Sequence, residues 1–316
     1  MMLLTNTYQY RRRLFAAVTA VACSFNTAQA LTIEFDYSYD TAGFFGKNQR
    51  AALDAAGQFY EESINQSFRG ISASGTNEWT ANFLDPSTGK STTIENMKVA
   101  DDSVVIFAGA MNMSQLGYGG YGGFNASGTT SFLDDVITRG IEGTINGTNT
   151  PGDDTAFATW GGQIMFDTDA NWHYGLSTTD LEFDEFDFYS VALHELGHVF
   201  GLGTADSWAA QIDSNGFFTG KNVIAEFGKT IMIDEDGDHF ADDTKSLSIE
   251  TGKLQDSIMS AAIRSGERRV FTALDVAALK DTTTWDINVD AVPEPSSAVL
   301  SLAGLALLAN RRTRRV

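Results

Sequence analysis

The run His194-Glu195-Leu-Gly-His198-Val-Phe-Gly201 constrains this chain more than any other stretch. Residues four positions apart share one face of a helix, so His194 and His198 can present two imidazole nitrogens to a single metal ion. Glu195 follows the first histidine, where its carboxylate can take a proton from a water activated by the metal. The alternative is a core helix whose histidines only make hydrogen bonds. Two histidines, the glutamate and the glycine occur together here, which favours the metal site.

The residues around this run predict a buried helix with defined ends. Asp187 is a suitable N-cap, and apolar residues at helical spacing follow it. Gly201 and Gly203 are natural stop residues. A helix that ends in such a turn allows the chain to come back with a third metal ligand.

Residues 1–30 have the layout of a secretory signal peptide, with Arg11–Arg13, an apolar stretch to Cys23, and Ala28-Gln-Ala30. We expect cleavage by signal peptidase after Ala30. Cys23 is the only cysteine of the chain. The remaining chain therefore forms no internal disulfide, and a metal site in it must use His, Asp or Glu. The formal net charge of −20 argues against nucleic-acid partners and suits an exported protein.

Residues 291–316 carry a second informative pattern. Pro293-Glu-Pro295 precedes an apolar stretch from Ala298 to Ala309, and a basic tail from Arg311 to Arg315 ends the chain. The apolar stretch is shorter than the about 20 residues of a membrane span. This order resembles the PEP-CTERM sorting signal of bacterial exported proteins. The resemblance implies transient membrane association, processing by an exosortase, and a final place at the surface or in the extracellular matrix of a Gram-negative-type bacterium.

The rest of the chain predicts an α+β fold in one domain, residues 31–290. Alternation predicts a strand over 31–39, and helical spacing predicts a helix over 49–68. Residues 103–108 and 160–167 read as further strands, and residues 271–280 as a closing helix. We interpret the glycine-rich residues 117–123 as a flexible surface loop. The strands precede the metal helix, and a mostly irregular half follows it, so the helix is expected at the floor of a cleft.

A catalytic zinc commonly has three protein ligands, and the third is less obvious than the first two. Thr204 stands where the short pattern HExxHxxGxxH has its last histidine, and threonine is a poor zinc ligand. His239 and Asp206 are two candidates for the third ligand. His173 and a glutamate such as Glu226 are further candidates.

The stretch Asp236-Gly-Asp-His239-Phe240 resembles the one that supplies a late third histidine in leishmanolysin-like metzincins. The resemblance implies that His239 is the main candidate for the third ligand and Asp206 the alternative. Asp256-Ser-Ile-Met259 looks like the Met-turn that follows that histidine in those proteins. Residues 162–166 resemble the edge strand that pairs with a substrate, and residues 271–281 resemble the closing helix of exported bacterial metalloproteases. The resemblance implies a metzincin-like zincin with a twisted mixed sheet, an active-site helix and an irregular C-terminal half containing the Met-turn.

The acidic stretch from Asp234 to Asp243 has two interpretations. Asp234, Asp236 and Asp238 place alternating carboxylates around a glycine, as structural calcium loops do, although the EF-hand spacing is incomplete. The other interpretation is a solvated acidic loop that positions His239.

Together these features predict a secreted or cell-surface zinc-dependent endopeptidase that acts on proteins or peptides. Zinc on His194, His198 and His239 would activate a water, and Glu195 would serve as the general base. The alternative is a catalytically inactive, zincin-like binding protein of the surface or extracellular matrix. The intact Glu195 favours the enzyme, because a zinc site used only for binding would not require it.

Overall fold

The computed structural model describes residues 31–140, 157–283 and 285–289. Its centre is a four-stranded sheet in the order β1-β4-β7-β5. The strands β1 (Thr32–Asp36), β4 (Ser103–Met111) and β7 (Gly161–Asp167) are parallel, whereas β5 (Gly117–Tyr121) runs antiparallel at the edge. The sheet is therefore mixed, as predicted.

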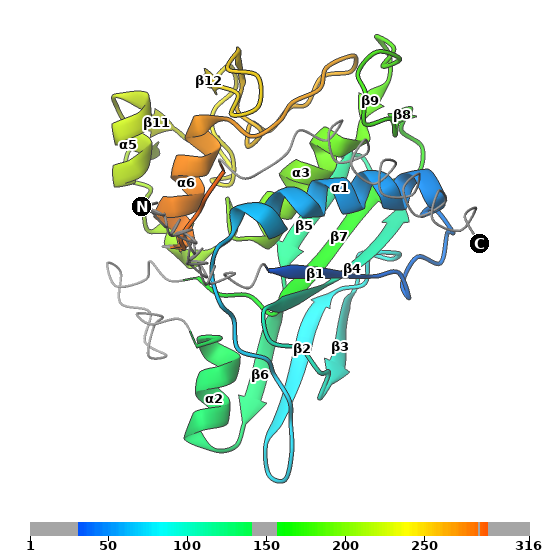
Figure 1. Ribbon diagram of the computed structural model, residues 1–316, viewed down its shortest axis with the longest axis vertical. Coiled ribbons are helices and arrows are strands. Elements are labelled where there is room, and N and C mark those ends of the chain that lie inside the picture. Colours follow the sequence, from blue (N-terminus) through cyan, green and yellow to red (C-terminus); the bar gives the residue numbers. More distant parts are fainter. Residues whose placement is uncertain (1–30, 141–156, 284, 290–316) are drawn as a thin grey trace, which may run out of the picture.

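Two helices cover one face of this sheet, α1 (Lys47–Ser63) and α3 (Phe188–Val199) (Figure 1). Tyr60 of α1 joins them, because its Oη donates a hydrogen bond to the carbonyl of Leu193 over 2.7 Å. The strand β4 alternates between two cores, as a strand buried on both faces does. Val104 and Ile106 pack under the helices, and Val105 and Phe107 pack on the other side.

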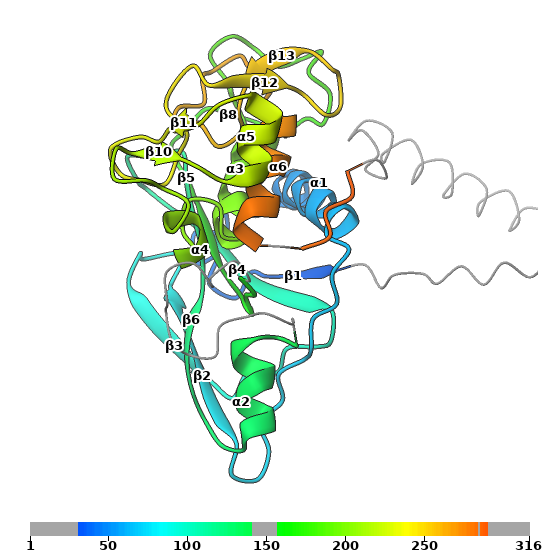
Figure 2. The ribbon, with the colours of Figure 1, turned by 90° about the vertical axis from the view of Figure 1, so that its left-hand side faces the viewer.

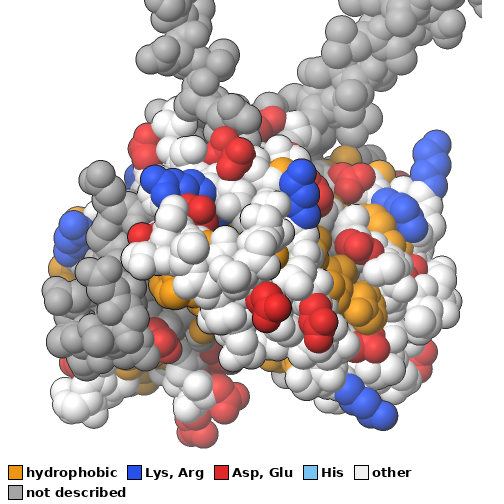
Figure 3. Space-filling view, turned by 90° about the horizontal axis from the view of Figure 1, so that it is seen from below, with side chains coloured by type: hydrophobic (Ala, Val, Ile, Leu, Met, Phe, Trp, Pro, Cys, Tyr) orange, Lys and Arg blue, Asp and Glu red, His pale blue; other side chains and the backbone are white. Residues whose placement is uncertain are grey.

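That other side is covered by a smaller layer. A three-stranded sheet in the order β3-β2-β6 is made of β2 (Glu78–Leu84), β3 (Ser91–Glu95) and β6 (Gly123–Ser127). It lies below the central sheet with α2 (Thr130–Ile137), as Figures 1 and 2 show. Trp79 and Phe83 of β2 form the second core with Phe107 and Trp160. Seen from this side, acidic side chains are spread among neutral ones, in keeping with the net charge of −20 (Figure 3).

The part of the chain after α3 consists of short elements connected by long irregular segments. The elements are α4 (Asp206–Ala209), β10 (Phe217–Phe218), α5 (Lys221–Phe227), β11 (Ile231–Met232), β12 (Lys245–Leu247), β13 (Leu254–Asp256) and α6 (Ala273–Thr283). Most of them lie towards the end of the molecule opposite to α2, whereas α4 lies level with the central sheet (Figure 2). Before α3, β8 (Trp172–His173) pairs with β9 (Phe186–Asp187). The irregular second half and the closing helix agree with the sequence interpretation.

Two predictions about strands were wrong. The glycine-rich residues 117–123 are not a loop, because residues 117–121 form β5 and pair with β7. Residues 162–166 are not at the edge either, since β7 lies between β4 and β5. The edge strand beside α3 is β5. The helix predicted over 49–68 exists but ends at Ser63, where Ile64 turns extended and pairs with Ile287.

Among the described residues, no helix combines the length and the apolar composition needed to cross a bilayer. The predicted signal peptide (1–30) and the C-terminal segment (291–316) lie outside the described residues.

Candidate metal centre and catalytic cleft

The helix α3 supplies the first two histidines of the site. Asp187 is its N-cap, as predicted, and accepts a hydrogen bond from the backbone N–H of Ser190 over 3.0 Å. Arg268 forms an ion pair with the same carboxylate at 2.6 Å and fixes the start of the helix to the segment before α6. His194 and His198 lie one turn apart on the buried face. The helix therefore presents both rings from a rigid, buried support.

His239 comes from the loop between β11 and β12. The carboxylate of Asp234 folds this loop by accepting backbone N–H groups of Gly237, Asp238 and His239 at 2.9 to 3.3 Å. The loop reaches α3 through Gly203, where a β-carbon would lie 2.1 Å from the carbonyl oxygen of Asp238. A glycine after the helix therefore allows the distant loop to bring its histidine close.

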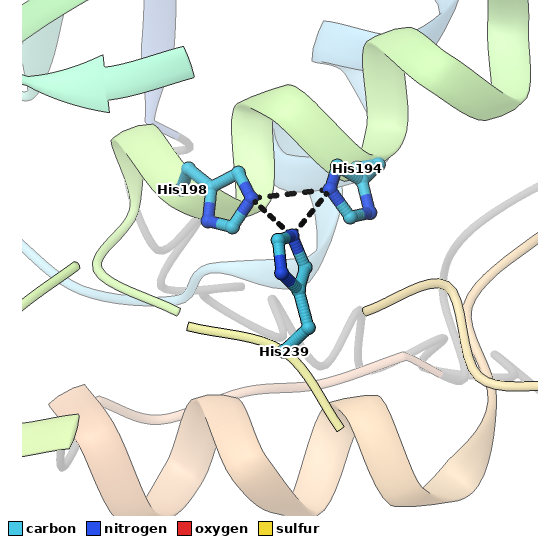
Figure 4. A group of neighbouring side chains, drawn as sticks. All are labelled: His194, His198 and His239. Carbon is cyan, nitrogen blue, oxygen red and sulfur yellow. Dashed lines mark hydrogen bonds between the residues drawn. The ribbon is translucent and has the colours of Figure 1, made fainter. Parts of the chain in front are cut away.

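The three histidines converge on one point, as Figure 4 shows. Their Nε2 atoms lie 3.1 Å apart between His194 and His198, and 3.2 Å from each of these to His239. Three nitrogens bound to one tetrahedral zinc would stand about 3.3 Å apart, given zinc–nitrogen bonds of about 2.0 to 2.1 Å. Within the described chain, these three side chains form one of two groups that could hold a metal ion.

The hydrogen bonds made by Nδ1 of His194 and of His198 support a metal site at the Nε2 atoms. Nδ1 of His194 faces the carbonyl of Ile258 at 2.7 Å, and Nδ1 of His198 faces the carbonyl of Leu202 at 2.8 Å. Carbonyls only accept, so both Nδ1 atoms must donate. In a neutral ring the Nε2 atom then carries a lone pair. Converging lone pairs repel one another unless a cation lies between them, so the donor set fits a divalent metal.

The pKa values of His194 and His198 agree with neutral rings. Burial and the neighbouring histidines lower the pKa of His194 well below its usual 6.5, and burial lowers that of His198 to about 4. Burial alone would also lower the pKa of His239, but the carboxylates of Asp238 and Asp234 raise it. Their oxygens lie 2.7 Å and 3.0 Å from its Nδ1.

Glu195 lies in the same cleft, held against the glycines of β5. Burial raises the pKa of its carboxyl group to about 8, against the charge of His239 and a hydrogen bond from the backbone N–H of Gly119. A nearby divalent cation would lower this pKa. A β-carbon on Gly117 would stand 2.7 Å from Oε1 of Glu195, and one on Gly119 would stand 2.1 Å from its carbonyl oxygen. Only a glycine-rich edge strand can approach α3 so closely.

These glycines are functional positions that the sequence interpretation missed. The signal was present as the repeated glycines of residues 117–123, since close backbone approach is a standard reason for glycine in a strand.

Met259 lies directly beneath the metal-binding turn of α3. It is fully buried, and a β-carbon on Gly197 would come within 2.8 Å of its sulfur. The buried carboxylate of Asp275 holds the segment that carries Met259, because it accepts hydrogen bonds from the backbone N–H of Ile258 and from the hydroxyl of Ser257. The segment that carries Met259 therefore also positions His194, through the carbonyl of Ile258.

The other candidate ligands lie elsewhere. Asp206 begins α4 and belongs to neither group of ligand atoms found in the described residues. His173 lies in β8, with Nε2 donating to the carbonyl of Ser177 over 3.0 Å and Nδ1 3.4 Å from Glu185. Glu226 is exposed on α5. Thr204 closes the end of α3, since its hydroxyl donates to the carbonyl of His198 over 2.6 Å.

The acidic loop is organised around His239. Asp234 and Asp238 direct their carboxylates to this ring, and with it they form the second group that could hold a metal. Asp236 is exposed and is not a member of that group. The arrangement agrees with the loop that positions His239, and calcium binding stays a prediction.

A cleft of about 600 Å³ lies over the three histidines. Its walls come from the start of β5, from α3, and from the segment after Met259. The lining includes Leu116, Gly117, Val191, Glu195, Asp238 and Ile263. The cleft therefore has room for a segment of another polypeptide to contact the three histidines and Glu195 together.

Two family models match the chain. Residues 138–212 match the matrixin family model, a segment that contains α3 with His194, Glu195 and His198 and ends before His239. Residues 291–315 match the PEP-CTERM protein-sorting motif. Neither curated proteins nor solved structures yield a match.

These matches confirm the resemblance to a metzincin-type metalloprotease of the exported PEP-CTERM class. The matrixin match implies a metzincin-like α+β fold and a zinc metallopeptidase, which acts on peptides. The sorting motif indicates an exported protein that is processed at its C-terminus by an exosortase.

Proposed function

We propose that this chain is a zinc-dependent endopeptidase of the cell surface or extracellular matrix. The observation that carries the proposal is the convergence of three Nε2 atoms, 3.1 to 3.2 Å apart, in the cleft that also holds Glu195. His194, His198 and His239 are the proposed ligands, and Met259 is the proposed Met-turn residue below them.

When bound, zinc supplies Lewis-acid chemistry and lowers the pKa of water. Residues of this chain would transfer the proton, bind the peptide and orient the metal ligands. Glu195 is placed to take the proton from the attacking water and to return it to the leaving amine. The N–H of Gly119 orients its carboxylate, and the cleft holds the peptide beside it. The carbonyls of Ile258 and Leu202 fix the rings of His194 and His198.

The decisive experiment compares the full chain with Glu195→Gln and His239→Ala. Zinc per chain is measured by elemental mass spectrometry, and turnover by hydrolysis of casein with and without a chelator. We expect one zinc and chelator-sensitive hydrolysis in the parent, zinc without hydrolysis in Glu195→Gln, and little zinc in His239→Ala. The matched control is Glu226→Gln, an exposed position on α5, which should retain both properties.

Two outcomes would change the conclusion. Hydrolysis that persists in Glu195→Gln would remove this residue from the mechanism. Zinc without hydrolysis in the parent would favour the alternative, a zincin-like binding protein.

A further inference from the structure

A second hollow, of about 400 Å³, continues from the catalytic cleft. Tyr118 and Thr204 line both spaces. The second hollow lies between the edge strand β5 and the smaller sheet, whose strands β2 and β3 contribute Asn82, Leu84 and Ser91. We call this space the side groove. It is built by the smaller sheet, which contributes nothing to the three histidines.

Gln163 fixes the floor of the side groove. It is only 4% exposed, and its Oε1 accepts the backbone N–H of Leu84 over 3.3 Å. Its Nε2 lies 2.9 Å from the point where a β-carbon on Gly120 would stand. One buried amide therefore holds β2 against β7, next to Gly120 of β5, which has no side chain. The width of the groove depends on this contact and on the glycine.

The chemistry of the side groove differs from that of the cleft. Among the described residues that line it, none carries a formal charge, whereas the cleft contains Asp167, Glu195 and Asp238. Tyr118, 41% exposed, and Tyr121 offer aromatic surface, and amides and hydroxyls surround them. Asp206 lies close enough to Tyr121 to act on its phenol, whose pKa is raised by burial and by this carboxylate. A negative ligand would be disfavoured there.

An extended peptide would pass this groove. β5 is the last strand of its sheet, and such an edge can pair with an added strand. Gly119 lies beside Glu195, and Tyr121 is two residues further along, roughly 7 Å at strand spacing. On a peptide antiparallel to β5, residues before the scissile bond lie towards Tyr121. The side groove then lies beside the peptide side chain that is two or three residues before the scissile bond.

We propose that the side groove binds a large uncharged side chain of the substrate, preferably aromatic, two or three residues before the scissile bond. This inference rests on the proposed peptidase function and assigns part of its specificity to the smaller sheet. An aromatic ring of the substrate can stack on the tyrosines of the groove. The amides and hydroxyls at the edge of the groove can form hydrogen bonds with the peptide backbone that carries this ring.

The test is a cleavage profile of the zinc-loaded full chain on a diverse peptide library, read by mass spectrometry. We expect aromatic residues to be enriched, and Asp and Glu depleted, at one position before the cut. Tyr121→Ala should reduce that enrichment about tenfold and leave preferences after the cut unchanged. Ser91→Lys, at an exposed rim position, should turn the depletion of Asp and Glu into acceptance.

The matched control is Ser127→Lys, which places the same charge at an exposed position of β6, in the same small sheet but outside the groove lining. It should keep the parent profile. Melting temperature and zinc content show that each variant is folded. A parent that cleaves, with a profile unchanged in Tyr121→Ala and Ser91→Lys, overturns the groove proposal and leaves the peptidase intact. A zinc-loaded parent that cleaves nothing overturns both.

Discussion

The carbonyl oxygen of Asp238 lies 2.1 Å from the point where a β-carbon on Gly203 would stand. Gly203 also has a φ of +74°, in the left-handed region that favours glycine. The turn after α3 and the loop that carries His239 therefore meet backbone to backbone. This contact brings a histidine far along the chain to the metal-binding helix.

Replacing Gly203 by alanine should displace the His239 loop, because the added carbon would overlap the backbone carbonyl of Asp238. We expect Gly203→Ala to weaken zinc binding by at least about tenfold, as measured by competition with a chromogenic chelator. Gly216→Ala is the matched control, since φ there is +78° and nothing lies within 4 Å of the added carbon. Gly216→Ala has only the backbone strain of a β-carbon at positive φ, which should lower the stability by about 1 kcal/mol. It should bind zinc as tightly as the parent does. Equal zinc affinity in both variants would contradict this account of the loop.

Replacing Gly117 by alanine should act on the proposed general base rather than on the metal. The added carbon would lie 2.7 Å from Oε1 of Glu195, whose carboxylate must then rotate away. We expect kcat to fall about 100-fold, with zinc content unchanged. Gly123→Ala, in the same stretch but with its nearest atom 3.9 Å away, should retain activity. Unchanged kcat in Gly117→Ala would show that Glu195 does not depend on this contact.

The sequence predicted those parts of the fold whose signals are local. The N-cap at Asp187, the helix with both histidines, and the strands around residues 103–108 and 160–167 follow from caps and apolar patterning. The strand β5 was missed, because glycines have no side chains that could alternate. Its composition reflects contact with α3, which is a tertiary property. The position of β7 inside the sheet depends on its neighbours and not on its own residues.

Among the site residues, the two histidines of α3 came from one motif, whereas His239 was chosen through a resemblance. No local pattern says that the Asp234 loop reaches α3, and the contact at Gly203 is visible only in the fold. The smaller sheet was not predicted, although Glu78–Leu84 alternates between buried and less buried residues as a strand does.

Asp234 should affect zinc affinity without being a ligand. Its carboxylate holds three backbone N–H groups of the loop and faces Nδ1 of His239 at 3.0 Å. We expect Asp234→Ala to weaken zinc binding about 10- to 100-fold, because the ring loses its orientation. Asp236→Ala, on the exposed side of the same loop, should leave zinc affinity unchanged. Equal zinc affinity in Asp234→Ala and the parent would contradict the role of this carboxylate in positioning His239.

Asp256 should make stability depend on acid pH. Burial alone would raise the pKa of its carboxyl group, but the hydrogen bond from Lys245 and the charge of Arg269 lower it below the usual 3.8. A carboxyl group whose pKa is lower in the folded state stabilises the fold above its unfolded pKa. This contribution is lost as the pH falls through 3.8 towards the lowered value. The free energy of unfolding in urea should therefore decrease over that range.

In Asp256→Asn this part of the pH dependence should be absent. The variant should also be less stable at neutral pH by about 3 kcal/mol, because Arg269 is only 2% exposed and loses a partner 3.1 Å away. Asp243→Asn is the control, since that carboxylate is 74% exposed and 3.7 Å from Arg264. It should alter stability by less than about 1 kcal/mol. A parent and an Asp256→Asn variant with parallel pH profiles between pH 2 and 5 would show that this buried ion pair does not set the acid limit of the fold.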